Sequence, residues 1–221
     1  MNEFEEYIQA AGINCEEVSA IEQVDGNLDP AKDLFQYYVP KLSPDGSCSA
    51  EKGGLEEEPY DLRDILGVTN TNERNIEEQI KTLYKLLEGI QQELKTDWIG
   101  VYQVATNKDG INVLVKLAYQ GSPSRAEFPL TEEFAPLSNN TTVGLTGKAV
   151  LIQSVGQHEG AYYKCDGDVN SEACLPVYDK DFTKVIGIID AESFQEEYFG
   201  PKNLSLLAQL CVQLSNYLPV K

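Results

Sequence analysis

The sequence predicts an α+β fold, in which an N-terminal and a C-terminal helix pack on one face of an antiparallel sheet. Two observations carry this prediction. Apolar residues recur at every third or fourth position over residues 73–94 and again over 202–217, which is the period of an amphipathic helix. Between these stretches lie short apolar runs separated by turn residues, a pattern typical of strands.

The first long helix is expected to begin after Asn72, a residue type favoured at helix N-caps. Glu73, Glu77 and Glu78 follow in the early turns, where the helix dipole favours acidic side chains. The apolar stripe of this helix consists of Ile76, Ile80, Leu83, Leu87, Ile90 and Leu94.

Two strands are expected next, over residues 98–104 and 113–120. Asn107-Lys108-Asp109-Gly110 lies between them and is a favourable hairpin turn. Residues 121–141 contain three prolines and indicate irregular structure.

The rest of the sheet and the closing helix are predicted from the last third of the chain. A short helix is expected to open at Gly144 and to run into an apolar strand. Two more strands, over residues 173–178 and 185–190, are separated by a turn at Asp179-Lys180-Asp181. The C-terminal helix then carries a second stripe, formed by Leu204, Leu207, Cys211 and Leu214.

Residues 1–67 are expected to form an acidic N-terminal extension, partly helical or mobile, to a domain of residues 68–221. The extension holds 16 acidic and 4 basic residues, which is a net charge of −12 out of −19 for the whole chain. Two short helices are expected in it, the first near Phe4 and the second over residues 31–38. Glycine, proline and glutamate residues over 41–60 indicate a loop, so we expect this region to pack loosely.

Composition limits the partners and the compartment. A surface this acidic repels phosphates, so nucleic acid and membrane partners are not expected. No apolar run approaches the roughly 20 residues of a membrane span, and the acidic start of the chain does not resemble a signal peptide. Five cysteines without framework spacing indicate free thiols in a reducing compartment, so we expect a cytoplasmic protein. The sequence leaves open whether the protein is a homodimer. A single histidine excludes a His-based zinc site, and neither a metal nor a cofactor is expected.

Five short motifs carry a resemblance to a known family. They are Trp98-Ile99-Gly100-Val101-Tyr102, Gly144-x-x-Gly147-x-Ala149, Cys165-Asp166, Ser171-Glu172-x-x-Leu175-Pro176 and Ile186-Gly187-x-x-Asp190-x-Glu192-Ser193. In this order they resemble a GAF domain and, more narrowly, the free methionine-(R)-sulfoxide reductase family. The resemblance covers residues 75–219. Its most specific part is the Cys-Asp pair, followed by Glu172 and then by an Asp-x-acid motif.

The resemblance implies a role for each matching residue. Cys165 matches the family's nucleophile, and the adjoining Asp166 is a further substrate-binding candidate. The carboxylates that hold the substrate ammonium match Glu172, Asp190 and Glu192, the last standing where the family usually has Asp. The family's aromatic wall matches Trp98 and Tyr102.

Three positions depart from the family pattern. Arg125 and Thr146 stand where the family has the two cysteines that recycle the nucleophile, and Tyr162 stands where it has a histidine. Cys174 and Cys211 lie in apolar runs and are expected in the core. The usual regeneration of Cys165 is therefore lost, and a thiol reductant from outside the chain is needed.

The chemistry of these residues agrees with the resemblance. A thiolate that attacks a sulfoxide sulfur becomes a sulfenic acid while an acid protonates the departing oxygen. Carboxylates crowded in one pocket bind the ammonium of a free amino acid, and one of them can stay protonated and serve as that acid. Asp190 and Glu192 are two apart in a strand, so their side chains point to the same face, as do those of Trp98 and Tyr102.

Three functions stay open. The first is reduction of free L-methionine-(R)-sulfoxide or a related small sulfoxide by the Cys165 thiolate. The second is a non-catalytic GAF module that binds a small, free amino acid-like ligand in the same pocket. The retained cysteine and carboxylates favour the enzyme, and the missing recycling cysteines favour the binding module. A third hypothesis is a regulatory or scaffolding protein that acts through the acidic extension.

Overall fold

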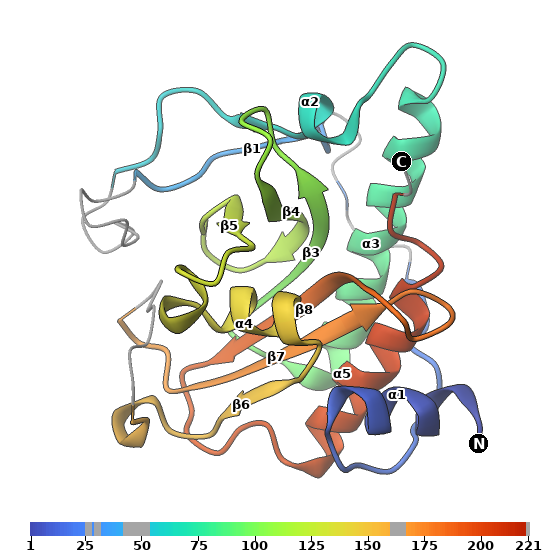
Figure 1. Ribbon diagram of the computed structural model, residues 1–221, viewed down its shortest axis with the longest axis vertical. Helices are drawn as coiled ribbons and strands as arrows, with labels where there is room; N and C mark the ends of the chain where they lie inside the picture. Colours follow the sequence, from blue (N-terminus) through green and yellow to red (C-terminus); the bar gives the residue numbers. More distant parts are fainter. Residues whose placement is uncertain (25–27, 29–31, 42–53, 160–166, 220–221) are drawn as a thin grey trace.

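The computed structural model describes residues 1–24, 28, 32–41, 54–159 and 167–219. Among them, six strands form one antiparallel sheet, flanked by helices (Figure 1). Their order across the sheet is β5 (Glu127–Pro129), β4 (Asn112–Gln120), β3 (Trp98–Thr106), β8 (Val185–Ser193), β7 (Ser171–Tyr178) and β6 (Val150–Ile152). The predicted α+β fold is confirmed, because two long helices, α3 (Glu73–Leu94) and α5 (Pro201–Leu214), share one core with the sheet.

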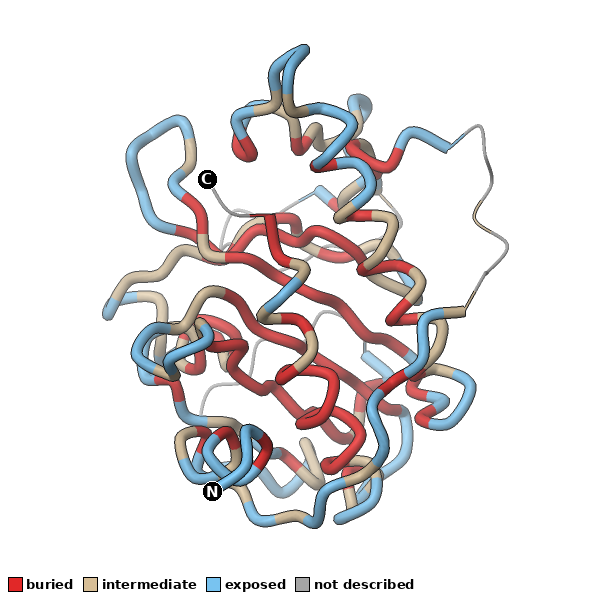
Figure 2. Tube along the Cα trace, turned by 90° about the vertical axis from the view of Figure 1, so that its right-hand side faces the viewer, coloured by how far each residue is buried: buried red, intermediate tan, exposed pale blue. Residues whose placement is uncertain are grey.

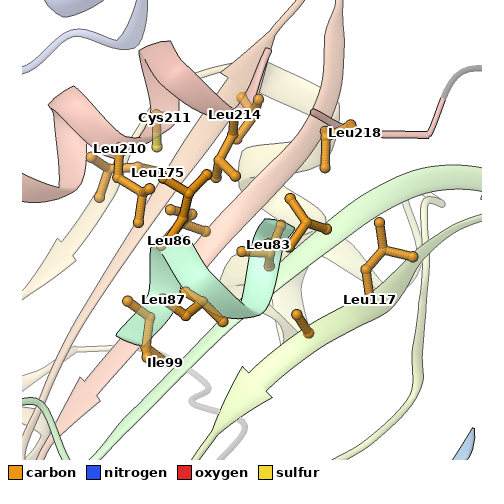
Figure 3. Close-up of a cluster of buried hydrophobic side chains, with 14 of the residues drawn as sticks. Leu83, Leu86, Leu87, Ile99, Leu117, Leu175, Leu210, Cys211, Leu214 and Leu218 are labelled. Carbon is orange, nitrogen blue, oxygen red and sulfur yellow. The ribbon is translucent and has the colours of Figure 1, made fainter. Parts of the chain in front are cut away.

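The core between the helices and the sheet contains every second side chain of the central strands. Odd-numbered residues of β7 and β8, such as Leu175 and Ile189, pack against the apolar stripes of α3 and α5. Figure 3 shows this cluster, in which Leu83, Leu86 and Leu87 come from α3 and Leu210 and Leu214 come from α5. The buried residues run along the central strands in Figure 2. The even-numbered residues of the same strands therefore face the opposite side of the sheet.

That opposite side is covered by α4 (Asn139–Thr146), which begins earlier than expected. Ser138 is the N-cap, and its side chain accepts a hydrogen bond from the Thr141 amide. The helix ends at Gly147, whose φ of 68° suits glycine. The prediction that a helix opens at Gly144 is thus wrong, because Gly144 lies inside α4 and the true start is set by the cap at Ser138.

The first helix of the extension is where the sequence places it. The helix α1 (Glu3–Ala11) begins with a capping box at Asn2 and contacts α5. Its buried Phe4 and Tyr7 belong to the same core cluster as the sheet, and the Tyr7 hydroxyl donates to the Pro176 carbonyl at 2.9 Å. The described part of the extension therefore shares the core of the domain.

The second helix expected in the extension is absent over the described residues 32–38. Gln36–Tyr37 forms a strand, β1, that pairs with β2 (Tyr60–Asp61), and a short helix α2 (Leu62–Leu66) follows. Asp33 explains part of this difference, because its side chain accepts a hydrogen bond from the Phe35 amide and competes with helical bonding. Most of the loop expected over residues 41–60 lies outside the described residues.

Candidate ligand pocket

Three rows of residues cross the sheet on the face that α4 covers. Trp98, Glu192 and Glu172 lie opposite one another on β3, β8 and β7. The next row on this face consists of Gly100, Asp190 and Cys174, and the third of Tyr102, Ile188 and Pro176. Residues directly opposite one another share a face, so the pairing places the predicted carboxylates and aromatic side chains together.

A pocket opens between these rows and the N-terminus of α4. Its empty volume, including the part that is open to solvent, is about 680 Å³. The side chains that line it are Asp97, Trp98, Tyr102, Ser122, Pro123, Ser124, Phe128, Ser138, Asn139, Asn140, Glu172, Asp190, Glu192 and Phe194. The set includes every predicted site residue that the structure describes, whereas Cys165 and Asp166 lie outside the described residues.

The three carboxylates are almost completely buried. Glu172 and Asp190 are each 5% exposed and Glu192 is 7% exposed. Two amide side chains at the start of α4 bind Glu172 and Asp190. Asn139 Nδ2 donates to Glu172 Oε2 at 3.1 Å, and Asn140 Nδ2 donates to Asp190 Oδ2 at 3.0 Å. Both carboxylates also lie at the positive end of the α4 dipole, which favours anions.

The pocket strongly perturbs the protonation of Asp190. Its burial, and then the negative charge of Glu172, raise the pKa of Asp190 well above its usual range, against a smaller opposite effect of the Asn140 hydrogen bond. Its Oδ1 atom has no hydrogen-bond partner among the residues that the structure describes. An acid that is buried beside another acid and faces a pocket is poised either to hold a proton or to meet a cation.

Cys174 lies beneath these carboxylates, as expected for a core cysteine. Burial, and then the charges of Asp190 and Glu172, raise the pKa of the Cys174 thiol well above its usual range. The thiol donates to Asn140 Oδ1 at 3.2 Å, so it supports the amide that holds Asp190. Cys174 is therefore a protonated structural thiol.

The aromatic wall is built from residues of β3 and β5. The rings of Trp98 and Tyr102 have centroids 6.3 Å apart, and Tyr102 meets Phe128 edge-on at 5.6 Å. Trp98 lies over Gly100, because a Cβ at that position would stand 2.3 Å from the indole Cη2. The indole N–H donates to the Ser122 carbonyl at 3.0 Å, which fixes the other edge of the ring.

Gly100→Ala is expected to displace the indole of Trp98 and to destabilise the fold. The added methyl group meets the ring well inside contact distance, and overpacking of this kind costs about 1–3 kcal/mol. Trp98 is the sole tryptophan, so its emission reports the displacement directly, and denaturant unfolding measures the loss. Gly156→Ala is the matched control for unfolding, because a Cβ there meets nothing within 4 Å and its φ is not positive.

The positions of the family's recycling cysteines have other roles here. The guanidinium of Arg125 lies over the rings of Phe128 and Phe134, at 5.5 and 5.0 Å from their centroids. The Thr146 hydroxyl donates to the Thr142 carbonyl at 2.7 Å in the last turn of α4. Both side chains thus serve the structure around the pocket.

Comparisons with known proteins agree with this architecture. No protein-family model and no curated protein sequence matches the chain. A GAF domain region from Geobacter sulfurreducens superposes with a TM-score of 0.54 at 18% identity, over 68% of this chain and 98% of that one. The chain has the GAF fold. In this GAF fold the carboxylates and the aromatic wall lie on the sheet face opposite α3 and α5.

Two enzymes with the same GAF fold are also similar in structure. The type II free methionine-R-sulfoxide reductase from Thermoplasma acidophilum has a TM-score of 0.55 at 19% identity, over 64% of this chain and 93% of that one. The free methionine-R-sulfoxide reductase from Neisseria meningitidis, solved in complex with its substrate, has a TM-score of 0.51 at 19% identity, over 82% and 97%. Likeness at these identities establishes the fold.

Two further properties concern only the described part of this GAF fold. No helix in it is long and apolar enough to cross a membrane. Nor do its His, Cys, Asp and Glu side chains form a group of three or more that could hold a metal ion.

Proposed function

We propose that the pocket binds a free amino acid of the methionine type and that Cys165 reduces its (R)-sulfoxide. The observation that carries the proposal is the set of three buried carboxylates, Glu172, Asp190 and Glu192, in one pocket with an aromatic wall. Burying like charges together is costly unless a cation compensates them. The ligand ammonium is that cation.

The remaining surface of the pocket suits the rest of such a ligand. Trp98, Tyr102 and Phe128 offer ring faces and edges to a thioether or sulfoxide tail, since sulfur packs favourably against aromatic rings. The carboxylates favour a free amino acid over a residue within a polypeptide, because the α-nitrogen of such a residue is an amide and not an ammonium.

The reaction proposed for Cys165 balances without a cofactor. The thiolate attacks the sulfoxide sulfur, the S–O bond breaks as the oxygen takes a proton, and the oxygen passes to the cysteine. The products are methionine and a Cys165 sulfenic acid. Two equivalents of an external thiol then return Cys165 to the thiol and leave a disulfide and water. Asp190, whose pKa is raised, supplies the proton.

A binding module without turnover is the second candidate, and a specific observation favours it. Arg125 and Thr146 replace the family's recycling cysteines, and burial raises the thiol pKa of each described cysteine, Cys15, Cys174 and Cys211. The described part of the chain thus offers no reactive thiol to resolve a sulfenic acid. Methionine formation distinguishes the two candidates, whereas ligand binding is common to both.

Free methionine or its (R)-sulfoxide is expected to raise the melting temperature of the protein. At a hundredfold excess over Kd the stabilisation amounts to about 2.7 kcal/mol, which differential scanning fluorimetry detects easily. The control ligand is 4-(methylthio)butanoate, which keeps the tail and the carboxylate of methionine and lacks only the ammonium. An equal shift with this control, or no shift with millimolar amino acid, removes the ammonium site from the proposal.

A further inference from the structure

Lys116 is a completely buried cation behind the wall of the pocket. It lies on β4 opposite Tyr102 and has 0% of its surface exposed. Three aromatic rings surround its ammonium, with centroids at 4.1 Å for Tyr119, 4.9 Å for Tyr37 and 6.0 Å for Trp98. A lysine in the middle of an apolar strand costs folding free energy, so its contacts need a reason beyond filling space.

The hydrogen bonds of Lys116 lead to the pocket wall. Its Nζ donates to the Ser124 carbonyl at 2.8 Å and to the Ser124 hydroxyl at 2.7 Å. Ser122, Pro123 and Ser124 all line the pocket, and the Trp98 indole N–H holds the Ser122 carbonyl. The wall of residues 122–124 is therefore held at one end by Trp98 and at the other by Lys116.

The turn that leads into this wall depends on Gly121. Its φ is +114°, and a Cβ there would lie 2.6 Å from the Trp98 ring and 2.8 Å from the Asp97 carbonyl oxygen. The chain thus leaves β4 in close contact with the indole, so a movement of the wall changes the surroundings of Trp98.

The N-terminal extension reaches Lys116 from the other side. The Tyr37 hydroxyl, on β1, donates to the Lys116 carbonyl at 2.7 Å, and the Tyr37 ring lies over the ammonium. Tyr37 stacks on Tyr60 of β2 at 5.6 Å, and the Tyr60 hydroxyl donates to Glu127 at 2.5 Å. Figure 1 shows β1 beside β4. Residues far from the pocket in sequence thus contact the cation that holds its wall.

We propose that Lys116 is a positioning residue for the ligand pocket and that Tyr37 of the extension sets its position. An ammonium donates to both oxygens of Ser124 and at the same time attracts the ring faces around it. A neutral side chain of the same length fills the space without holding the wall. Because the wall and Trp98 face the ligand tail, the extension controls ligand affinity without touching the ligand. This last step rests on the proposed function.

The test compares three variants of the full chain. Lys116→Met removes the ammonium and keeps the length, and Tyr37→Leu removes the ring and the hydroxyl. Tyr38→Leu is the matched control, since the neighbouring Tyr38 is 49% exposed. Acrylamide quenching of Trp98, the sole tryptophan, reports the wall without any ligand, and calorimetry with free methionine measures Kd.

Lys116→Met and Tyr37→Leu are each expected to make Trp98 more accessible to acrylamide and to raise the Kd for methionine about tenfold. Tyr38→Leu is expected to leave the quenching and the Kd unchanged. If Lys116→Met does not fold, Tyr37→Leu carries the test. Unchanged quenching and unchanged Kd in Tyr37→Leu, whatever its melting temperature, would overturn the proposal and leave Lys116 a purely stabilising residue. If the wild type binds no methionine, the proposed function fails, and the quenching comparison alone decides whether the extension positions the wall.

Discussion

One equivalent of free methionine-(R)-sulfoxide is expected to yield about one equivalent of methionine from the reduced wild-type protein, and Cys165→Ser is expected to abolish this product. Removing a nucleophile lowers the rate by about three orders of magnitude or more, which is the largest effect predicted for any single substitution here. Quantification of methionine, with the intact mass of the protein, measures both halves of the reaction. The protein gains one oxygen atom as the substrate loses it.

Cys174→Ser is the matched control for this experiment. Serine keeps a donor to the Asn140 side chain in place of the buried thiol, so the single turnover is expected to be unchanged. Dithiothreitol, a small thiol, should support repeated turnover, and thioredoxin should support it poorly because the expected intermediate is a sulfenic acid and not a protein disulfide. Absence of methionine from the wild type would leave the binding module as the function of the pocket.

Asp190→Asn is expected to act in opposite directions on stability and on binding. The variant removes a carboxyl group that is buried beside Glu172, so the ligand-free protein should gain about 1–3 kcal/mol at pH 8. The same change removes a charge that faces the ligand ammonium, so Kd should rise about a hundredfold. Denaturant unfolding and calorimetry measure the two effects, and a loss of both stability and affinity would contradict the assignment.

The stability gain of Asp190→Asn should depend on pH. The pKa of Asp190 is raised in the fold, so the folded protein keeps a proton that the unfolded chain has lost above the ordinary value of 3.8. The contribution of Asp190 to stability is therefore highest below that value and is lost as the pH rises toward the raised pKa. The groups that face it are Glu172 and Cys174 on β7, Glu192 on β8 and Asn140 on α4. The wild-type and variant curves should converge near pH 4.

Much of the site could be predicted because its residues obey the two-residue period of a strand. Asp190 and Glu192 share a face for that reason, and so do Trp98 and Tyr102. Asn139 and Asn140 were missed because they follow a proline-rich stretch that indicates irregular structure. The signal was Ser138, a residue type favoured at N-caps, directly before them.

The errors in the extension have a different origin. Residues 31–38 show a local pattern compatible with a helix, but Tyr37 is held by Lys116, 79 residues away in sequence. Local patterns carry no information on such a contact. Lys116 does have a signal in the sequence, because a lone lysine within an apolar strand indicates a bulge, an edge strand or a buried cation.

The long-range contacts of the extension also bear on the order in which the parts of the fold form. Tyr7 bonds to a carbonyl 169 residues further along the chain, and the Ile21 amide bonds to the Gln213 side chain 192 residues away. Contacts between segments so far apart in sequence require a long chain closure, whereas the contacts within a helix such as α3 are local. We expect α1 to dock late in folding, so that in refolding monitored by pulsed hydrogen exchange the amides of α1 gain protection after those of α3. Earlier protection of α1 would contradict this order.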